Sequence, residues 1–598
     1  MGDIKSNEAR FLFETSLGKF SVLDFSGKES VSMLYRFKIR LVSNDDEIQP
    51  EDLIKKQARL IFLTYDKKQR EISGIIGQAS IEENVSGRLI YSVTLHPFAW
   101  LLAFRKQSRI FQNMSVPEII ARIIQDAGFE KNTYFKMELS DQYPSREYCV
   151  QHNETDYHFI SRISSEEGIF FFFIHNDGNE CMVFGDDQKA YPECAPAKEV
   201  EYHPVTGTLR SERETLSHCS IDASVYSGKV VLKDYNYENP GMQLQFQSSS
   251  SKYQELEIYD HPGGFRESDH GEKLALKRRN ALMGRKVKIR GRGTYRCLAA
   301  GHKFTVSGHS QKGVNGLNLV LTVNHRGRQS QALVYGEADL EGATYDCSFV
   351  AVKAVTRIYA DYVIPKPKIS LQSGVIVGPS GEEIYTDEHG RVKVQFHWDR
   401  EGKKDGNSSC WIRVSQAWAG SGWGSMHIPR IGQEVIVDFF EGDPDKPVII
   451  GRVYNGENLP PYPNEKTRSG VKSNSTIGGG GSNEIRFEDK KGEEEFFTHA
   501  QKDQNEIVEN CMTTTIKADK ILLVEKNRTT TVKLENDKLT VEKGIREVEV
   551  VTGNETHKNG ADFTHEVMGN FNLKVGGNLT IEVSGTATIK GATVQLNP

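Results

Sequence analysis

The stretch FNLKVGGNLTIEV, residues 571–583, decides the fold that the sequence predicts. Its two halves share one pattern, because the apolar residues of the first half, Phe571, Leu573 and Val575, have apolar counterparts eight residues later. In each half, apolar and polar residues alternate, which is typical of a β-strand with one apolar face. Between the halves, Gly-Gly-Asn is a turn signal. The stretch therefore predicts two short strands joined by a tight turn.

The same eight-residue period runs through the C-terminal part of the chain. Gly569, Gly577 and Gly585 fall on it, and the segment TTTIK at 513–517 recurs as TTTVK at 529–533, two periods later. Repeats of fixed period indicate a stacked, elongated architecture. We assign the apolar residues of the last repeats to the interior of this structure: Phe563, Val567, Phe571, Leu573, Val575, Leu579, Ile581, Val583 and Ile589.

Each repeat is too short to enclose a core of its own. A single ribbon of this kind would leave its apolar face and its strand edges open to water. Several identical chains wrapped about one axis would cover both. We therefore predict an intertwined, triple-stranded β-prism in a homotrimer, and a single-chain β-solenoid is the alternative.

Composition limits the function classes. The chain has 598 residues, too many for one core, so several domains are expected. Its 75 basic and 81 acidic residues give a net charge of −6, which argues against nucleic acid as a partner. The eight cysteines are scattered singly without a CxxC pair, so neither a zinc ribbon nor a thioredoxin-like site is indicated. Their spread suits reduced thiols in the cytoplasm, although an even count also allows disulfides.

The chain shows no targeting segment. Residues 1–10 are polar and lack the hydrophobic region of a signal peptide. The longest intensely apolar run, Ile169–Ile174, is too short to cross a membrane. The sequence therefore predicts a protein that is cytoplasmic or is exported by a dedicated machine.

Residues 1–370 are predicted to be mainly strands. Two helices interrupt them, Val116–Phe129 and Glu154–Glu167, each with one apolar face and a glycine directly before or after its last predicted residue. The run Ile169–Ile174 has no polar face, so it is expected to be a strand buried on both sides. A basic helix is expected at Gly271–Met283, with its leucines packed and its lysines and arginines in solvent.

The second half of the chain divides at Pro365–Pro367, a predicted linker. Residues 371–455 contain five or six short strands, including one at Met426–Pro429, and fit a small OB-type barrel. We expect four parts: a hub region at 1–370, the OB barrel at 371–455, a glycine-rich transition at 456–500 and the prism at 501–598.

The chain contains no linear motif of a catalytic site. The tetraglycine at 478–481 lacks the lysine and the helix of a phosphate-binding loop, and a close crossing of chains near a symmetry axis explains it better. The histidines have no compact metal-ligand spacing, and no nucleophile elbow occurs. The adjacent carboxylates of Glu166 and Glu167 should diverge on a regular element. We therefore predict no catalytic, cofactor-binding or metal-binding residues.

Four tryptophans are concentrated in the predicted barrel, where they could stack bases or sugars. Because many carboxylates accompany them, core packing and contact between chains is the better interpretation. The four are Trp398, Trp411, Trp418 and Trp423.

Several long segments resemble those of VgrG proteins, the trimeric spikes of bacterial type VI secretion systems. They are YCVQHNETDYHFISR at 148–162 with its continuation to GIF at 168–170, DEHGRVKVQFHWD at 387–399, the segment 422–438 beginning GWG, EGDPD at 441–445 and GGGGSNEIRFED at 478–489. VgrG proteins are similar to a fusion of the hub and spike proteins of contractile phage tails. The resemblance implies a mainly β fold: a hub of two β-barrel-like domains with small helical additions, an OB domain and a trimeric β-prism.

The resemblance also implies partners and a function. The hub would sit on the ring-forming tube protein (Hcp) within the baseplate, a PAAR-repeat protein would cap the prism tip, and effectors or adaptors would ride as cargo. The spike would assemble in the cytoplasm and then be secreted or injected. The phage spike carries a lysozyme domain, but Asn455 passes almost directly to the glycine run, and the chain stops soon after the last repeat.

A structural spike that punctures target envelopes, without an enzymatic domain, is therefore expected. Two alternatives are a spike with an unrecognised envelope-degrading site and the hub or spike protein of a contractile phage-like particle.

Overall fold

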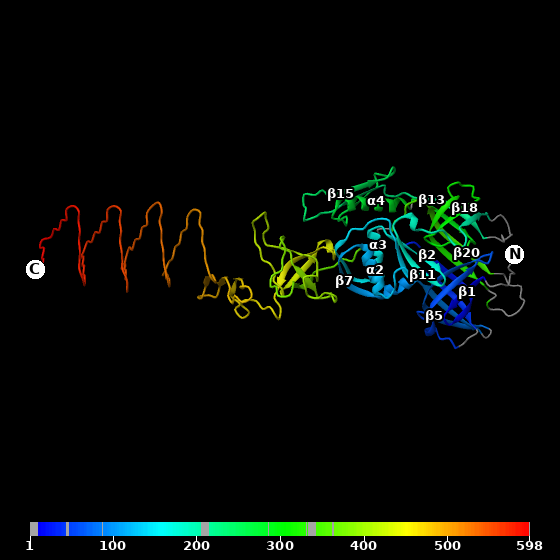
Figure 1. The fold of residues 1–598 in the computed structure, drawn as a ribbon, viewed down its shortest axis with the longest axis horizontal. Coiled ribbons are helices and arrows are strands. Elements are labelled where there is room, and N and C mark those ends of the chain that lie inside the picture. The colour runs from blue at the N-terminus through cyan, green and yellow to red at the C-terminus, as the bar shows by residue number, and fades with distance from the viewer. Residues whose placement is uncertain are drawn as a thin grey trace. The chain divides into compact units, whose positions relative to one another are not determined.

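A computed structural model describes residues 10–43, 47–85, 88–204, 214–284, 286–329, 332, 343–360 and 364–596. The chain forms two compact units, Met1–Gln504 and Asn505–Pro598, which are described separately (Figure 1). The last two residues, which we expected at the tip of the prism, lie outside the described residues.

Two fused β-barrels form the N-terminal part of the first unit. Its 12-stranded sheet follows the order β1-β4-β5-β6-β3-β2-β19-β18-β12-β13-β17-β20. Because β1 also pairs with β2, and β19 with β20, the order closes into two rings of six strands. The antiparallel pair β2–β19 joins the rings. The predicted pair of barrel-like hub domains is confirmed.

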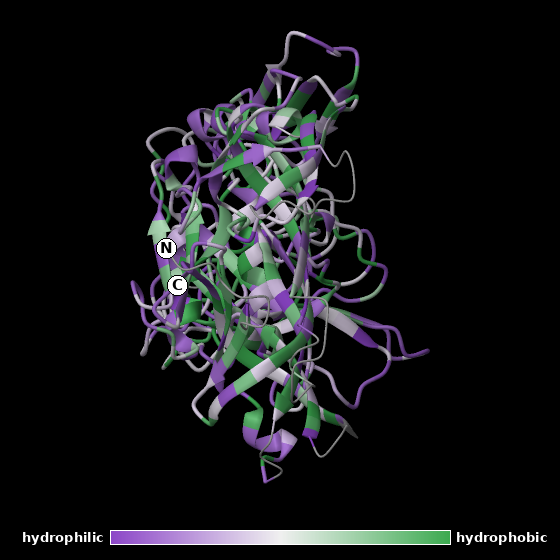
Figure 2. Ribbon diagram, turned by 90° about the vertical axis from the view of Figure 1, so that its right-hand side faces the viewer, coloured by the Kyte–Doolittle hydropathy of each residue, from purple (hydrophilic) through white to green (hydrophobic). Residues whose placement is uncertain are grey.

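The first barrel consists of β1 (Phe11–Thr15), β2 (Gly18–Ser30), β3 (Met33–Ser43), β4 (Gln57–Leu63), β5 (Gln69–Val85) and β6 (Arg88–His96), with α1 (Pro50–Leu53) between β3 and β4. The second consists of β12 (Glu199–Tyr202), β13 (Thr215–Ala223), β17 (Val287–Gly293), β18 (Lys303–Ser307), β19 (Gly316–Arg328) and β20 (Thr344–Lys353). Hydrophobic and hydrophilic residues alternate along many strands (Figure 2), as one-sided burial requires.

A buried polar network lies where the two barrels join. Glu29 of β2 binds Arg70 of β5 at 2.5 Å and His325 of β19 at 2.9 Å. The second ring nitrogen of His325 lies 2.6 Å from the hydroxyl of Tyr345. Burial alone would raise the pKa of Glu29, but the charge of Arg70 and the hydrogen bond from His325 hold that pKa well below its ordinary value.

The segment between the barrels contains both predicted helices. Its elements are η1 (Phe98–Phe104), β7 (Lys106–Met114), α2 (Val116–Asp126), β8 (Phe135–Glu138), β9 (Arg146–Thr155), α3 (Asp156–Glu166), β10 (Phe170–Asn176), β11 (Asn179–Gly185) and η2 (Gln188–Ala190). Helix α2 begins with a capping box of Ser115 and Glu118, which satisfies free backbone groups of its first turn. It ends at Asp126, slightly earlier than predicted.

Strand β10 is buried on both sides, as its four phenylalanines predict. Phe171 and Phe173 contribute to the main core of the hub, whereas Phe170 and Phe172 belong to a second cluster with Tyr191. Successive side chains of a strand point to opposite faces, so one strand fills two cores.

A three-stranded sheet covered by α4 (Ser268–Gly284) forms a smaller domain from β14 (Lys229–Lys233), β15 (Gln245–Ser249) and β16 (Glu257–Asp260). The predicted helix is confirmed, but the prediction that its basic face is solvated is wrong for Lys277. That side chain is buried, and its ammonium group lies 2.8 Å from Asp141. Conversely, Leu276, which we expected to pack, is exposed.

The OB barrel contains β21 (Gln372–Val377), β22 (Lys393–Phe396), β23 (Arg413–Val414), β24 (Glu434–Phe439) and β25 (Pro447–Val453), with η4 (Phe440–Gly442) after β24. Its sheet order is β22-β21-β24-β25-β23, and a bridge between Val392 and Ile412 closes the ring. The strand predicted at Met426–Pro429 does not form. His427 there donates to the side chain of Gln416 instead of a ladder, and Pro429 has no N–H to donate.

A second three-stranded sheet follows, from β26 (Arg468–Lys472), β27 (Glu484–Glu488) and β28 (Glu495–His499). The tetraglycine lies in the loop between β26 and β27. Gly478 and Gly480 have φ angles of 84° and 60°, and a Cβ on Gly481 would lie 2.2 Å from the side chain of Gln501. These requirements arise within one chain, so a crossing of chains at this place stays a proposal.

The buried phenylalanines of β10 provide a test of the hub core. We expect Phe171→Ala to destabilise the protein by about 4 kcal/mol, because it opens a large cavity. Phe104→Ala removes a mostly exposed ring and should cost under about 1 kcal/mol. Denaturant unfolding followed by circular dichroism measures both, and equal effects would contradict the assigned core.

Candidate trimerisation surface and its support

The second unit exposes the apolar residues assigned to the prism interior. Within residues 505–596 the structure has no hydrogen-bonded strand. Figure 1 shows this unit, in orange to red, as a chain that repeatedly runs out and back in similar loops. The nine assigned side chains are all exposed, from 42% for Val567 and Val575 to 75% for Ile589. One chain therefore leaves this repeated apolar face without a core.

The exposed apolar face extends further toward the N-terminus than the nine assigned residues. Ile516, Val524, Val532 and Val548 are also exposed, and all four fall on one eight-residue register, which differs from the registers of the nine assigned residues. Our assignment omitted them because it used only the last repeats. The recurrence of TTTIK as TTTVK was the signal that could have found them.

Two of the four tryptophans form a second exposed surface. Trp418 and Trp423 are 65% and 58% exposed, and their rings meet edge to face at 4.9 Å. Backbone hydrogen bonds from Gly420 to Trp423 and from Ser425 to Trp418 hold them on one hairpin. Exposed tryptophans are typical of protein interfaces.

The other two tryptophans pack against neighbouring aromatic rings. Trp398 stacks on Phe396 at 5.2 Å, and Trp411 lies 4.8 Å from the ring of Tyr385. Core packing is therefore confirmed for Trp398, which packs against the barrel core. Trp411 is half-buried, and core packing stays a prediction for it. Contact between chains stays a prediction for the exposed pair.

Strand β9 attaches the hub to the OB barrel. Tyr148 and Val150 are buried in the same cluster as the barrel residues Val437 and Ile449. The backbone N–H of Val150 donates to Asp445 at 2.7 Å. Two of the segments that resemble VgrG proteins, 148–162 and 441–445, thus meet at this junction.

Lysine and arginine side chains reinforce this junction. The ammonium group of Lys366 bridges Asp443 and Asp445 at 2.6 and 2.5 Å. On another side of the barrel, the guanidinium of Arg391 contacts Glu238 of the smaller domain at 2.6 Å. Each pair joins a residue of the OB barrel to a residue outside it, so the pairs help to fix the barrel in the first unit.

Glu166 and Glu167, which we expected to diverge, converge on one guanidinium group. Arg146 donates an N–H from one terminal nitrogen to Glu166 and from the other to Glu167, at 2.7 Å in both cases. The planar fork of arginine makes this possible because it presents donors in two directions. Glu167 also accepts a hydrogen bond from His270 of α4 at 3.1 Å, so it ties the smaller domain to the hub.

Burial and these partners shift the pKa of Glu167 in opposite directions. Burial alone would raise the pKa of its carboxyl group, but the hydrogen bond from His270 and the charge of Arg146 hold that pKa at about 2. The carboxylate is therefore charged at neutral pH. The two adjacent glutamates thus form an ion-pair network with Arg146.

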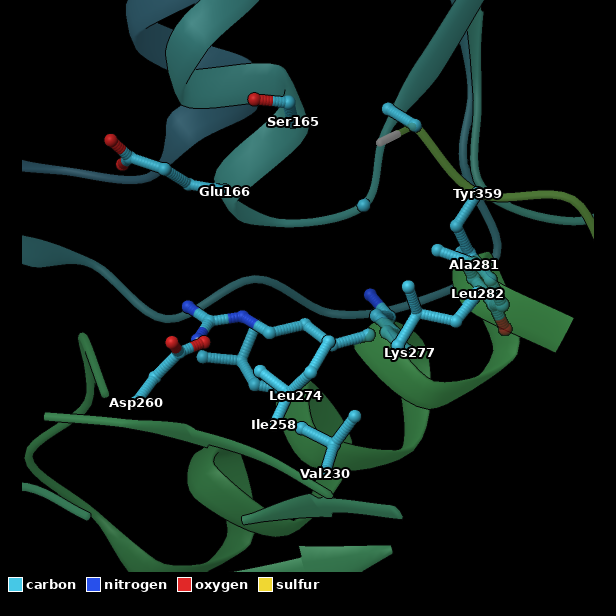
Figure 3. Close-up of a pocket in the computed structure, with 13 residues that line it drawn as sticks. Ser165, Glu166, Val230, Ile258, Asp260, Leu274, Lys277, Ala281, Leu282 and Tyr359 are labelled. Carbon is cyan, nitrogen blue, oxygen red and sulfur yellow. The ribbon is translucent and has the colours of Figure 1, made fainter. Parts of the chain in front are cut away.

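A pocket near these residues is structural in character. It measures about 320 Å³ and lies between the end of α3, the sheet of the smaller domain and α4 (Figure 3). Val230, Ile258 and Leu274 form its apolar wall. Its charged side chains already have partners: Lys277 binds Asp141, and Asp260 binds Arg278 at 3.3 Å.

No cluster of three or more histidine, cysteine or carboxylate side chains that could hold a metal occurs in the described residues. All eight cysteines are free, and seven of them are buried or half-buried. In the part of the chain that the structure describes, no helix is long and apolar enough to cross a membrane.

Comparison with known proteins agrees with this architecture. Residues 28–331 match the family described as phage tail baseplate hub, residues 382–454 match the type VI secretion system/phage-baseplate injector OB domain, and residues 469–589 match the bacteriophage T4 gp5 C-terminal trimerisation domain. The spike protein VgrG1b of Pseudomonas aeruginosa is 40% identical over 502 residues, which cover 83% of this chain and 67% of that protein. The chain belongs to the VgrG family of type VI secretion system spike proteins.

Other VgrG relatives and structures agree. VgrG1a of the same organism is 39% identical over 492 residues, covering 81% of this chain and 76% of that protein. The c3393 protein of Escherichia coli, a type VI secretion component, has the same fold with a TM-score of 0.53 at 22% identity. The match covers 74% of this chain and 99% of c3393.

The VgrG of a Francisella PdpA–VgrG complex also shares the fold. Its TM-score is 0.53 at 10% identity, with 82% of this chain and 88% of that chain covered. This VgrG family member is thus a structural spike protein with a trimerisation domain, which indicates a homotrimer.

Replacing Glu167 tests the ion-pair network. We expect Glu167→Gln to lower stability by about 3 kcal/mol at neutral pH, because Arg146 loses a buried partner. A depressed carboxyl pKa contributes stability above its unfolded value and loses it as the pH falls through its folded value. The difference in free energy of unfolding between wild type and variant should therefore shrink as the pH falls from 4.5 to about 2.

Denaturant unfolding at a series of pH values measures this difference, provided that the protein remains folded at the acidic end. Glu130→Gln, at an exposed position, is the matched control and should change little. A difference that stays constant below pH 4.5 would show that the charge of Glu167 contributes nothing.

Proposed function

We propose that three copies of this chain form the central spike of a type VI secretion apparatus. The prism is the puncturing needle, and the hub is its base. The repeated apolar face of the second unit carries this proposal, because it has no core within one chain and coincides with the trimerisation match. The nine residues from Phe563 to Ile589 are proposed to line the interior of the trimer.

Stiffness is the property that such a needle requires, because sheath contraction would supply the work. Each Å² of apolar surface that the trimer buries contributes about 25 cal/mol to its stability. The eight-residue period repeats this contribution along the needle, and closure of three chains removes free strand edges. The exposed Trp418 and Trp423 are proposed to contact a neighbouring chain near the base of the needle.

The partners follow from the position of each part. We propose the boundaries 1–370, 371–455, 456–500 and 501–598 for hub, OB barrel, transition and prism. Two family matches lie within the proposed hub and OB barrel, whereas the trimerisation match already begins at residue 469. The hub would bind the Hcp-type tube protein within the baseplate, and the prism end would bind a PAAR-repeat tip protein. Effectors or adaptors would be carried along; a Francisella VgrG has been observed in complex with PdpA.

We further propose that the spike assembles in the cytoplasm, leaves the cell through its own apparatus and acts without catalysis. The adjacent carboxylates Glu166 and Glu167 are engaged in structural ion pairs with Arg146, which supports a mechanical role. The neighbouring genes or the secretion phenotype would separate this role from that of a phage-like particle.

Val575→Asp tests the assigned interior of the prism. Three carboxylates buried around one axis would repel each other, so we expect loss of the heat-resistant trimer. Asn572→Asp adds the same charge at a polar position of the same repeat and should leave the trimer intact. Native mass spectrometry and heated gel electrophoresis measure both variants. A fully folded, heat-resistant Val575→Asp trimer would refute the assigned register.

A turbidity assay on purified cell walls tests the absence of catalysis. We expect the purified trimer to leave the turbidity unchanged, whereas added lysozyme lowers it. Clearing by the trimer that survives stringent purification would establish the alternative, an envelope-degrading spike.

A further inference from the structure

A basic hollow lies over the outer face of the seam between the two barrels. It measures about 930 Å³ and spans β3, β2, β19, β20 and β17. Its lining contains five cationic side chains that point outward and one carboxylate, Asp346. The five cations are Lys28, Arg36, Lys38, Arg292 and Arg326.

The arrangement of these charges is unfavourable for the isolated fold. Lys28 and Arg36 are direct neighbours across the β2–β3 pair, and both are exposed. Like charges at directly opposite positions destabilise a sheet. A surface under selection for stability alone would place an acid at one of these positions.

The only carboxylate in the lining relieves little of this repulsion. Asp346 is opposite Arg326 in the strand register, but its carboxylate binds Arg292 at 2.8 Å. Among the residues that the structure describes, no carboxylate lies within ion-pair distance of Lys28, Arg36, Lys38 or Arg326. Four neighbouring cations thus face the hollow without such a partner.

We propose that this hollow docks an extended, acidic segment of another protein. Arg36 and Lys38 are two residues apart on one face of β3, which places them about 7 Å apart. Acidic side chains on one face of an extended segment recur at the same spacing, so such a segment could pair with both at once. Acids that reach across the sheet would meet Lys28 and Arg326 on the adjoining strands.

Nucleic acid suits this surface less well. The lining contains no Phe, Tyr or Trp on which a base could stack, its one histidine, His325, is buried, and the net charge of the chain is −6. The surface is complete within one chain. The inference therefore goes beyond the proposed trimer, and its failure can be told apart from a failure to trimerise.

Binding of a labelled peptide to the full chain tests the proposal. The probe is an alternating Glu-Thr peptide of about twelve residues. Its binding is measured by fluorescence anisotropy at rising NaCl concentration. Alternating Gln-Thr and Lys-Thr peptides are the controls. We expect only the Glu-Thr peptide to bind, with an affinity that falls as salt rises. Absence of binding at low salt would overturn the proposal, including the case in which a second copy covers the hollow.

Arg36→Glu separates a docking role from a structural role. The new carboxylate faces Lys28, so we expect the melting temperature to stay equal or rise, while peptide affinity falls about fivefold or more. Lys273→Glu, exposed on α4 away from the hollow, should keep affinity within about twofold. Unchanged affinity of Arg36→Glu would overturn the proposal.

Binding of an oligothymidine of similar length tests the remaining alternative, that the hollow binds nucleic acid. If it bound more tightly than the Glu-Thr peptide, the hollow would be a nucleic-acid surface and the proposal would be wrong. The mass of each sample is measured in parallel, so that failure to trimerise is recognised separately from failure to bind.

Discussion

The pairing of β2 with β19 is the constraint on which the hub depends. It converts two separate rings of strands into one continuous sheet. On the inner side of this seam, Glu29 joins Arg70 of the first barrel to His325 of the second. Removing one partner of such a buried group costs about 3–5 kcal/mol, because the remaining charge loses its partner.

The same seam explains the outer basic surface. Side chains alternate across a strand, so Glu29 points inward where Lys28 points outward, and His325 points inward where Arg326 points outward. The inner residues satisfy one another, whereas the outer ones gather like charges. A single strand pair therefore supplies both the stability of the hub and a surface that the isolated chain does not neutralise.

Local patterns predicted those elements whose burial is decided by their own residues. The isoleucines of α2 and the phenylalanines of β10 are in the core, as their periodicity indicates. The errors concern side chains whose partners lie far away in the sequence. Lys277 is buried because Asp141 reaches it, and Glu166 and Glu167 converge because Arg146 lies between them. No pattern along α4 or α3 contains that information.

The candidate site shows the same division. The sequence by itself determined the eight-residue period, the alternation within it and therefore an apolar face too large for one chain, since these depend only on neighbouring residues. Its long matching segments also determined the family. Only the tertiary structure decided why those segments matter to one another, for example that Val150 and Asp445 meet, and that Lys28, Arg36 and Arg326 share one surface. Long-range strand pairing brings such residues together, and spacing along the chain does not encode it.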